Sequence, residues 1–169
     1  MPKVAVVIGS DSDFDVVQKS LTTLDKFGVD YDAMVISAHR NPEKIFKFAS
    51  EAEADGYEVI VTAAGKAAHL AGVIAGITPL PVIGIPIKTS FQGGLDSLLS
   101  IVQMPSGVPV ATVAVNGAEN AAVLAVQILS VKYPALREKM KAYKAELNDA
   151  VVAKNVNLQK RQRDRKSVV

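Results

Sequence analysis

The sequence predicts an α/β domain built on a five-stranded parallel sheet, followed by a long C-terminal helix. Short runs rich in β-branched residues alternate with longer stretches of helical periodicity, the pattern of repeated βαβ units. Residues 4–8 form an unbroken apolar run, as expected for a parallel strand that is covered on both faces. The predicted strands span residues 3–8, 31–37, 58–63, 81–86 and 110–115. The predicted helices lie near residues 13–27, 42–55, 67–77, 93–103 and 119–131.

The order of the strands predicts where a ligand would bind. Five strands with helical crossovers most often form a three-layer sandwich of the flavodoxin-like order 2-1-3-4-5. In open α/β sheets, ligands bind beside the carboxyl ends of the strands at the point where the strand order reverses. That point lies between the first and third strands here, so we expect the loops after strands one, two and three to form one crevice.

The composition is that of a globular protein, with 169 residues of which 49% are hydrophobic and 21% charged. Cysteine is absent, which excludes disulfides and thiolate chemistry. With only two histidines, we expect no metal site. The first apolar run is too short for a signal sequence or a membrane span, so we expect a cytoplasmic protein without a membrane partner.

The charge divides the chain into two parts. Residues 1–131, the predicted flavodoxin-like catalytic domain, contain 8 Lys and Arg against 13 Asp and Glu. Residues 132–169, the predicted helical extension, contain 11 against 4. Much of this excess lies in residues 160–166, where no aromatic side chain could stack on a base. We therefore expect a frayed, solvated basic end and no nucleic-acid partner.

The extension carries an apolar stripe at a spacing of mostly three or four residues, typical of one helix face. The stripe consists of Leu136, Met140, Tyr143, Leu147, Val151 and Leu158. A helix added to a complete βα domain needs a surface to cover, which could belong to its own subunit or to a neighbour. We favour docking on a neighbouring subunit.

The first candidate loop, Gly9-Ser10-Asp11-Ser12-Asp13, lies between a predicted strand and a predicted helix. Glycine allows close backbone approach, and serine hydroxyls with free N–H groups at a helix start can hold an oxyanion. Simple helix capping fits the same residues equally well. Because Asp11 and Asp13 would repel a bare phosphate, the motif fits a sugar phosphate whose ribose hydroxyls engage a carboxylate.

The second candidate loop is formed by residues 37–42. Pro42 suits the first turn of the next helix and Asn41 its cap, which leaves His39 and Arg40 in the loop itself. The arginine side chain is a planar fork suited to phosphate, and histidine exchanges protons near neutral pH. Taken alone, a loop histidine is more often only a surface residue.

The third candidate loop, residues 63–70, is rich in small residues and brings Gly65, Lys66 and His69 together. It is compatible with a ligand site or with a close-packed turn around a buried histidine. The predicted strand order would place all three loops, and both histidines of the chain, in one crevice. That convergence favours a pocket.

Four segments resemble a known family. Residues 9–13, 37–42, 67–70 and 95–105 occur in the order found in the bacterial class of aminoimidazole ribonucleotide carboxylases, the 5-(carboxyamino)imidazole ribonucleotide mutases of the purine pathway. The resemblance covers about residues 3–131. Residues 95–105 indicate only a packed helix by their chemistry, but they are a specific marker of this family.

The resemblance implies a flavodoxin-like homo-octamer without metal or organic cofactor. It implies an isomerase of purine biosynthesis that converts 5-(carboxyamino)imidazole ribonucleotide to 4-carboxy-5-aminoimidazole ribonucleotide. By this resemblance the phosphate would be surrounded by Ser10, Ser12, Ser37 and Arg40, and the ribose hydroxyls would bind Asp13. His39 would be the general acid/base. The ring and mobile carboxyl group would be enclosed by Ala64, Gly65, Lys66, Ala67, His69 and Leu70, with His69 as a second catalytic residue.

Some residues depart from the family pattern, and other functions remain open. The family usually has glycine where Lys66 stands and proline where Ala71 stands. Lys66 could neutralise a carboxylate or point outward. The alternatives are direct carboxylation of aminoimidazole ribonucleotide with carbon dioxide, carboxylation of a nicotinate nucleotide, and a non-catalytic module that binds FMN or a nucleotide.

Overall fold

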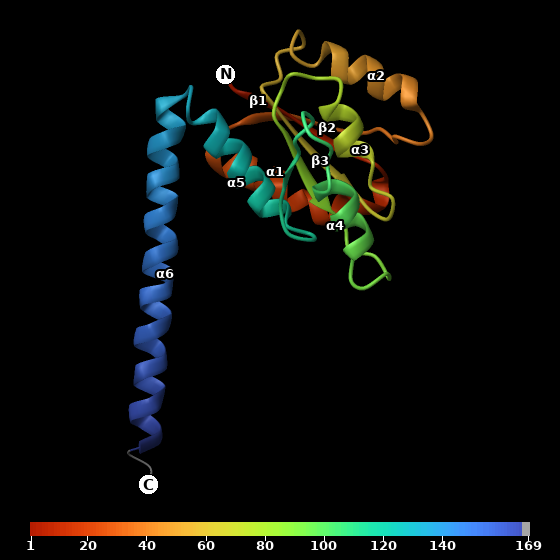
Figure 1. Ribbon diagram of the computed structural model, residues 1–169. Helices are drawn as coiled ribbons and strands as arrows, with labels where there is room; N and C mark the ends of the chain where they lie inside the picture. The colour runs from red at the N-terminus through yellow and green to blue at the C-terminus, as the bar shows by residue number, and fades with distance from the viewer. Residues whose placement is uncertain (167–169) are drawn as a thin grey trace.

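A five-stranded parallel sheet forms the middle layer of the computed structural model, which describes residues 1–166 (Figure 1). The strands are β1 (Lys3–Ile8), β2 (Asp30–Val35), β3 (Val59–Ala64), β4 (Val82–Pro86) and β5 (Ala111–Thr112). Every neighbouring pair is parallel, and the order is β2-β1-β3-β4-β5. The predicted fold class and strand order 2-1-3-4-5 are therefore confirmed.

Helices cover both faces of the sheet. They are the short 3₁₀ helix η1 (Asp11–Asp13), α1 (Phe14–Phe27), α2 (Pro42–Glu51), α3 (Leu70–Ala75), α4 (Leu95–Val102), α5 (Ala118–Leu129) and α6 (Pro134–Lys166). One apolar cluster joins the sheet to α1, α5 and the start of α6, and a second joins it to α2, α3 and α4. These two clusters make the predicted three-layer sandwich.

Strand β1 is the centre of both clusters. Its residues alternate between the faces, so that Val4 and Val6 pack towards α1 and α5, whereas Ala5 and Val7 pack towards α2 and α3. All four are buried. The apolar run of residues 4–8 predicted a strand covered on both faces, and β1 is indeed buried on both faces.

Three elements are shorter than the sequence predicts by four residues or more, because the chain turns early to build loops. The ladder of β5 stops after Thr112, although Val113 N–H still donates to the carbonyl of Gly84 at 3.1 Å. Helix α3 begins at Leu70 and not near residue 67, since the preceding residues form turns. Helix α2 ends at Glu51, and turns continue to Gly56, whose positive φ of 85° ends the segment.

The C-terminal helix α6 packs on its own domain only at its start. Leu136 and Met140 are buried, and Tyr143 contacts Phe27 edge-on with ring centroids 5.5 Å apart. From residue 144 to residue 166 every side chain is exposed, and the helix projects away from the body (Figure 1). The predicted docking on a neighbour thus concerns this outer part and stays a prediction.

The basic residues 160–166, expected to fray, form the last turns of α6, and residues 167–169 lie outside the described residues. Neither α6 nor another helix within residues 1–166 combines the length and apolar character needed to cross a membrane.

Gly84 lets α4 lie close against β4. A Cβ atom built at this position would overlap Cγ2 of Ile101 on α4, and would lie 3.1 Å from Cγ1 of Val110. Both neighbours are β-branched side chains that cannot swing far aside. Since α4 also supports a loop of the pocket described below, this glycine links the packing of the core to the site.

We expect Gly84→Ala to lower the free energy of unfolding by about 1–3 kcal/mol, because overpacking forces backbone or rotamer shifts. Denaturant unfolding at fixed protein concentration measures the change. Gly76→Ala is the matched control, since an added Cβ there would come no closer than 3.5 Å to another atom. Wild-type stability of the Gly84 variant would contradict this account of the packing.

Candidate functional site

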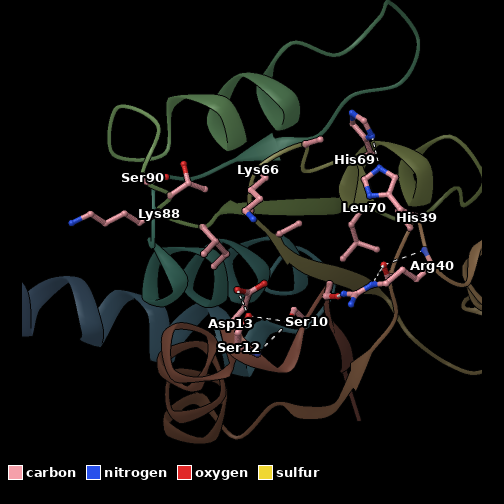
Figure 2. Close-up of a pocket in the computed structure, with 18 residues that line it drawn as sticks. Ser10, Ser12, Asp13, His39, Arg40, Lys66, His69, Leu70, Lys88 and Ser90 are labelled. Atoms are coloured by element: carbon pink, nitrogen blue, oxygen red, sulfur yellow. Dashed lines mark hydrogen bonds between the residues drawn. The ribbon is translucent and has the colours of Figure 1, made fainter.

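A cavity of about 540 Å³ opens at the carboxyl ends of the strands (Figure 2). The loops after β1, β2, β3 and β4 all contribute to its walls. The structure places every site residue named from the sequence around this one cavity: Ser10, Ser12, Asp13, Ser37, His39, Arg40, Ala64, Gly65, Lys66, Ala67, His69 and Leu70. These residues therefore line one pocket, while the binding or catalytic role of each stays a prediction.

Two backbone hydrogen bonds hold the strand ends together below the cavity. The N–H of Gly9 donates to the carbonyl of Ala63 at 3.0 Å, and the N–H of Ile36 donates to the carbonyl of Ile8 at 3.0 Å. These bonds extend the pairing of β1 with β3 and β2 by one residue each. The three loops therefore leave the sheet at the same level and face one another.

The loop after β1 begins with a 3₁₀ turn, in which Ser10 is the capping residue. The hydroxyl of Ser12 donates to Oγ of Ser10 at 2.9 Å, and the N–H of Ser12 donates to the same oxygen at 3.4 Å. Partial burial raises the pKa of Asp13 above its usual range; a hydrogen bond from Ser12 opposes the shift and the charge of Asp11 adds to it. A carboxylate partly removed from water is suited to accept hydrogen bonds from ligand hydroxyls.

Arg40 is held across the loops after β1 and β2. Its Nε donates to Oγ of Ser37 at 3.2 Å, and Nη2 donates to the carbonyl of Gly9 at 3.2 Å. The expected cap, Asn41, stands at the start of α2 but makes no capping hydrogen bond there. Instead its Oδ1 accepts from the N–H of Ser37 at 3.1 Å, which closes the loop on itself and fixes the base of Arg40.

His39 and His69 form a hydrogen-bonded pair. Nε2 of His39 lies 2.7 Å from Nδ1 of His69, and the two rings meet edge-on at an interplanar angle of 77° (Figure 2). One of these nitrogens must carry the proton and the other must accept it. Both side chains are exposed in the single chain, so a ligand can reach them. The pair can therefore hold or pass a proton at this end of the cavity.

The loop after β3 presents mainly backbone and small side chains. Gly65 leaves room beside Ile87, and Lys66 adopts a positive φ of 59° in the turn before α3. The N–H groups of Ala68 and His69 donate to the carbonyls of Lys66 and Ala67, respectively, at 2.9 Å. A flat ring could approach this wall closely, since few side-chain atoms project from it.

A fourth loop, which the sequence analysis did not include, completes the cavity. It contributes Ile87, Lys88, Thr89 and Ser90 after β4. Oδ1 of Asp96 at the start of α4 accepts from Oγ1 of Thr89 at 2.6 Å, and the N–H of Lys88 donates to Oδ1 of Asn116 at 2.9 Å. The predicted strand order was sufficient to indicate this loop, because it already placed β4 beside β3.

Within residues 1–166, no three His, Cys, Asp or Glu side chains are grouped as a metal ion would require. Besides Lys66 and the polar residues of the loop after β4, the cavity contains two sets of polar groups. Serine hydroxyls, Arg40 and Asp13 gather around the ends of β1 and β2, and the histidine pair lies beside the loop after β3. The fold and site thus define a flavodoxin-like α/β protein with a pocket of anion-binding and proton-exchanging side chains.

Comparison with known proteins identifies the family. Residues 3–150 match the AIRC family, described as AIR carboxylase, and the chain belongs to that family. It is 52% identical over 159 residues to the N5-carboxyaminoimidazole ribonucleotide mutase of Thermotoga maritima, covering 94% of this chain and 93% of that protein. It is 56% identical over 147 residues to the Pyrococcus abyssi protein of the same name, covering 87% and 84%. The family resemblance drawn from the sequence is confirmed.

A solved structure supports the same conclusion for the fold. The crystal structure of Treponema denticola PurE superposes with a TM-score of 0.83 at 28% sequence identity, covering 90% of this chain and 96% of that one.

We expect Thr89→Val to loosen the loop after β4, because valine keeps the shape of threonine but loses both hydrogen bonds of its hydroxyl, the one donated to Asp96 and the one accepted from the N–H of Phe91. Trypsin cleavage after Lys88 should become faster, and the free energy of unfolding should fall by about 1 kcal/mol. Thr22→Val on exposed α1 is the control, since its hydroxyl bonds only the carbonyl of Gln18. Unchanged cleavage at Lys88 would show that the hydroxyl of Thr89 does not hold the loop.

Proposed function

We propose that this protein is an isomerase of purine biosynthesis that interconverts 5-(carboxyamino)imidazole ribonucleotide and 4-carboxy-5-aminoimidazole ribonucleotide. The observation that carries the proposal is the histidine pair, with 2.7 Å between its nitrogens, in the same cavity as a tethered arginine and two serine hydroxyls. The membership of the family and the names of the two relatives support this substrate. A location in the cytoplasm belongs to the same proposal.

The phosphate of the nucleotide would lie where Ser10, Ser12, Ser37 and Arg40 meet. The guanidinium is fixed by Ser37 and Gly9, so little side-chain freedom would be lost on binding. A planar donor set of this kind suits a phosphate oxygen pair. Asp13, partly removed from water, would accept from the ribose hydroxyls.

The ring would lie against the loop after β3. At this wall, the ring would contact the backbone of Gly65 and Ala67 and the apolar side chains of Leu70 and Ala64. In this pose the exchanging carboxyl group would lie at the end of the cavity that contains His39 and His69. The phosphate would thus lie beside the serines and Arg40, and the reacting atoms beside the histidine pair.

The chemistry requires one proton to be given and one to be taken. His39 would protonate the exocyclic nitrogen, after which the nitrogen–carbon bond breaks and releases carbon dioxide. The electron-rich ring carbon then attacks the carbon dioxide, and the proton of that carbon returns to His39. The histidine ends as it began. Such acid–base transfer is typically worth about 10²–10⁴-fold in rate, and holding carbon dioxide beside the ring carbon adds a proximity effect.

His69 would act together with His39. Its nitrogen lies within hydrogen-bond distance of His39, so it would fix the orientation of the other ring and select the nitrogen that carries the proton. A donor or acceptor on the far side of a catalytic imidazole commonly has this effect.

We expect the wild-type protein to interconvert the two carboxylated nucleotides without added bicarbonate, and His39→Asn to lower turnover by about 10²-fold or more. Asparagine retains hydrogen-bonding capacity but cannot exchange a proton, so nucleotide affinity should change little. Turnover and calorimetric binding measured on the same preparations check both statements. Near-normal turnover of the variant would remove His39 from the proton transfer.

Arg40→Ala is the contrasting variant in this experiment. It should mainly weaken nucleotide binding, by about tenfold or more, because a charge-assisted contact to phosphate is lost. Bicarbonate serves as the second control, because the description of the family as a carboxylase favours direct carboxylation as the alternative. A rate that requires bicarbonate would favour that reaction over the isomerisation.

We also propose that the protein works as a homo-octamer in which the outer part of α6 packs on a neighbouring copy. The support is the apolar stripe of the helix, whose outer members are all about half exposed or more: Leu147, Val151 and Leu158. Val152 and Val156 are each 54% exposed but lie about 100–180° around the helix from these residues, so they are not part of the stripe. A second copy is the occupant we favour, because the stripe continues the buried residues at the start of the same helix.

We expect light scattering to give the mass of eight chains for the wild type and a smaller mass for Val151→Lys, which places a charge on the stripe. Ala153→Lys adds the same charge on the opposite side of the helix, about 200° away, and should assemble normally. A monomeric wild type would refute the octamer. Equal effects of both variants would refute the assigned face.

A further inference from the structure

Lys66 occupies a backbone conformation that favours glycine. Its φ is 59°, and it is one of three non-glycine residues with positive φ in the part of the chain that the structure describes. Two hydrogen bonds hold its carbonyl in place, from the N–H of Ala68 at 2.9 Å and from the hydroxyl of Ser100 at 3.4 Å. A lysine kept in such a conformation at the wall of a pocket is the kind of local strain that accompanies a functional role.

The side chain of Lys66 enters the cavity. Figure 2 shows it running from the loop after β3 into the space between the histidine pair and the loop that carries Ser12 and Asp13, whereas Lys88 extends away from these groups. A lysine without a role in the pocket would extend towards solvent, as Lys88 does. The direction of the chain therefore places a positive charge inside the pocket.

This charge has no carboxylate partner among residues 1–166. The four ion pairs found there involve Lys3, Lys26, Lys132 and Lys141, and none involves Lys66. Asp13 is the only acidic residue in the cavity lining that the structure describes. The guanidinium of Arg40, by contrast, is already bonded to Ser37 and Gly9. Three cations thus line the pocket, Arg40, Lys66 and Lys88, and Lys88 extends away from it, so among the described residues Lys66 is the cation that enters the cavity without a protein acceptor.

We propose that the ammonium group of Lys66 binds the exchanging carboxylate of the nucleotide and so selects carboxylated nucleotides over the decarboxylated one. This inference rests on the proposed function, which places the phosphate at Arg40 and the carboxylate beside the histidines. The carboxylate is the second anion of the substrate, and Lys66 is the cation that enters the cavity apart from the proposed phosphate site at Arg40. Carbon dioxide is neutral, so this attraction acts on both carboxylated nucleotides and not on the intermediate between them.

The test compares two ligands that differ only in this carboxylate, 4-carboxy-5-aminoimidazole ribonucleotide and 5-aminoimidazole ribonucleotide. Lys66→Met keeps the length of the side chain and removes its charge. Its affinity for the carboxylated ligand, measured by calorimetry, should fall about tenfold or more, as for other lost charge-assisted hydrogen bonds. Its affinity for the ligand without carboxylate should stay within about twofold of the wild type.

Two further variants separate charge from backbone effects. Lys66→Gly fits φ of 59° without strain, so it keeps the turn and should reproduce the selective loss. Lys66→Arg keeps the charge and should retain most of the preference for the carboxylated ligand. Lys44→Met on exposed α2 removes a lysine outside the cavity lining and should change neither affinity.

The outcomes distinguish this inference from the proposed function. If the wild type binds both ligands and isomerises the substrate, but Lys66→Met and Lys66→Gly weaken both ligands equally or neither, the assignment of Lys66 is wrong and the proposed function stands. If the wild type binds neither ligand and shows no turnover, the proposed function and this inference are both overturned.

Discussion

The parallel pairing of β1 with both β2 and β3 is the constraint on which the site depends. β1 lies at the point where the strand order reverses, and its neighbours are held at its end by the bonds from Gly9 to Ala63 and from Ile36 to Ile8. A shift of either strand by one residue would move its loop and turn its side chains to the other face. The serines, Arg40 and the histidine pair therefore meet only because the apolar residues of β1 are buried on both faces in this register.

The architecture could be predicted because it rests on local patterns. Apolar β-branched runs, glycines after helices and the alternation of elements define βαβ units, and the preferred order of five such strands then places the loops at one edge. The same reasoning located the loops containing Ser10, His39 and His69. The loop after β4 was not predicted to line the site, although the strand order already placed it beside the loop after β3.

Other features depend on tertiary contacts that no local pattern encodes. The chain turns after β5 and before α3 through Asn116 and Lys66, which adopt positive φ and make hydrogen bonds with residues of other loops and helices. Asn41 resembles a helix cap in the sequence, yet it closes the loop through Ser37. The separation between His39 and His69 depends on two loops from different strands, so the sequence could indicate their shared crevice but not their contact.

The proposed packing of the outer part of α6 on a neighbouring copy would link folding to association. In a single chain, the side chains of residues 144–166 are exposed, although Glu146 pairs with Lys26 of α1 at 2.9 Å, and an exposed helix of that kind depends on local interactions that leave it only marginally stable. The full α6, with 33 residues, is about 50 Å long, so its tip lies well beyond the sheet that anchors its first turns. Each subunit would then finish folding only when a partner arrives, and dilution would unravel the end of the chain before it disturbed the pocket.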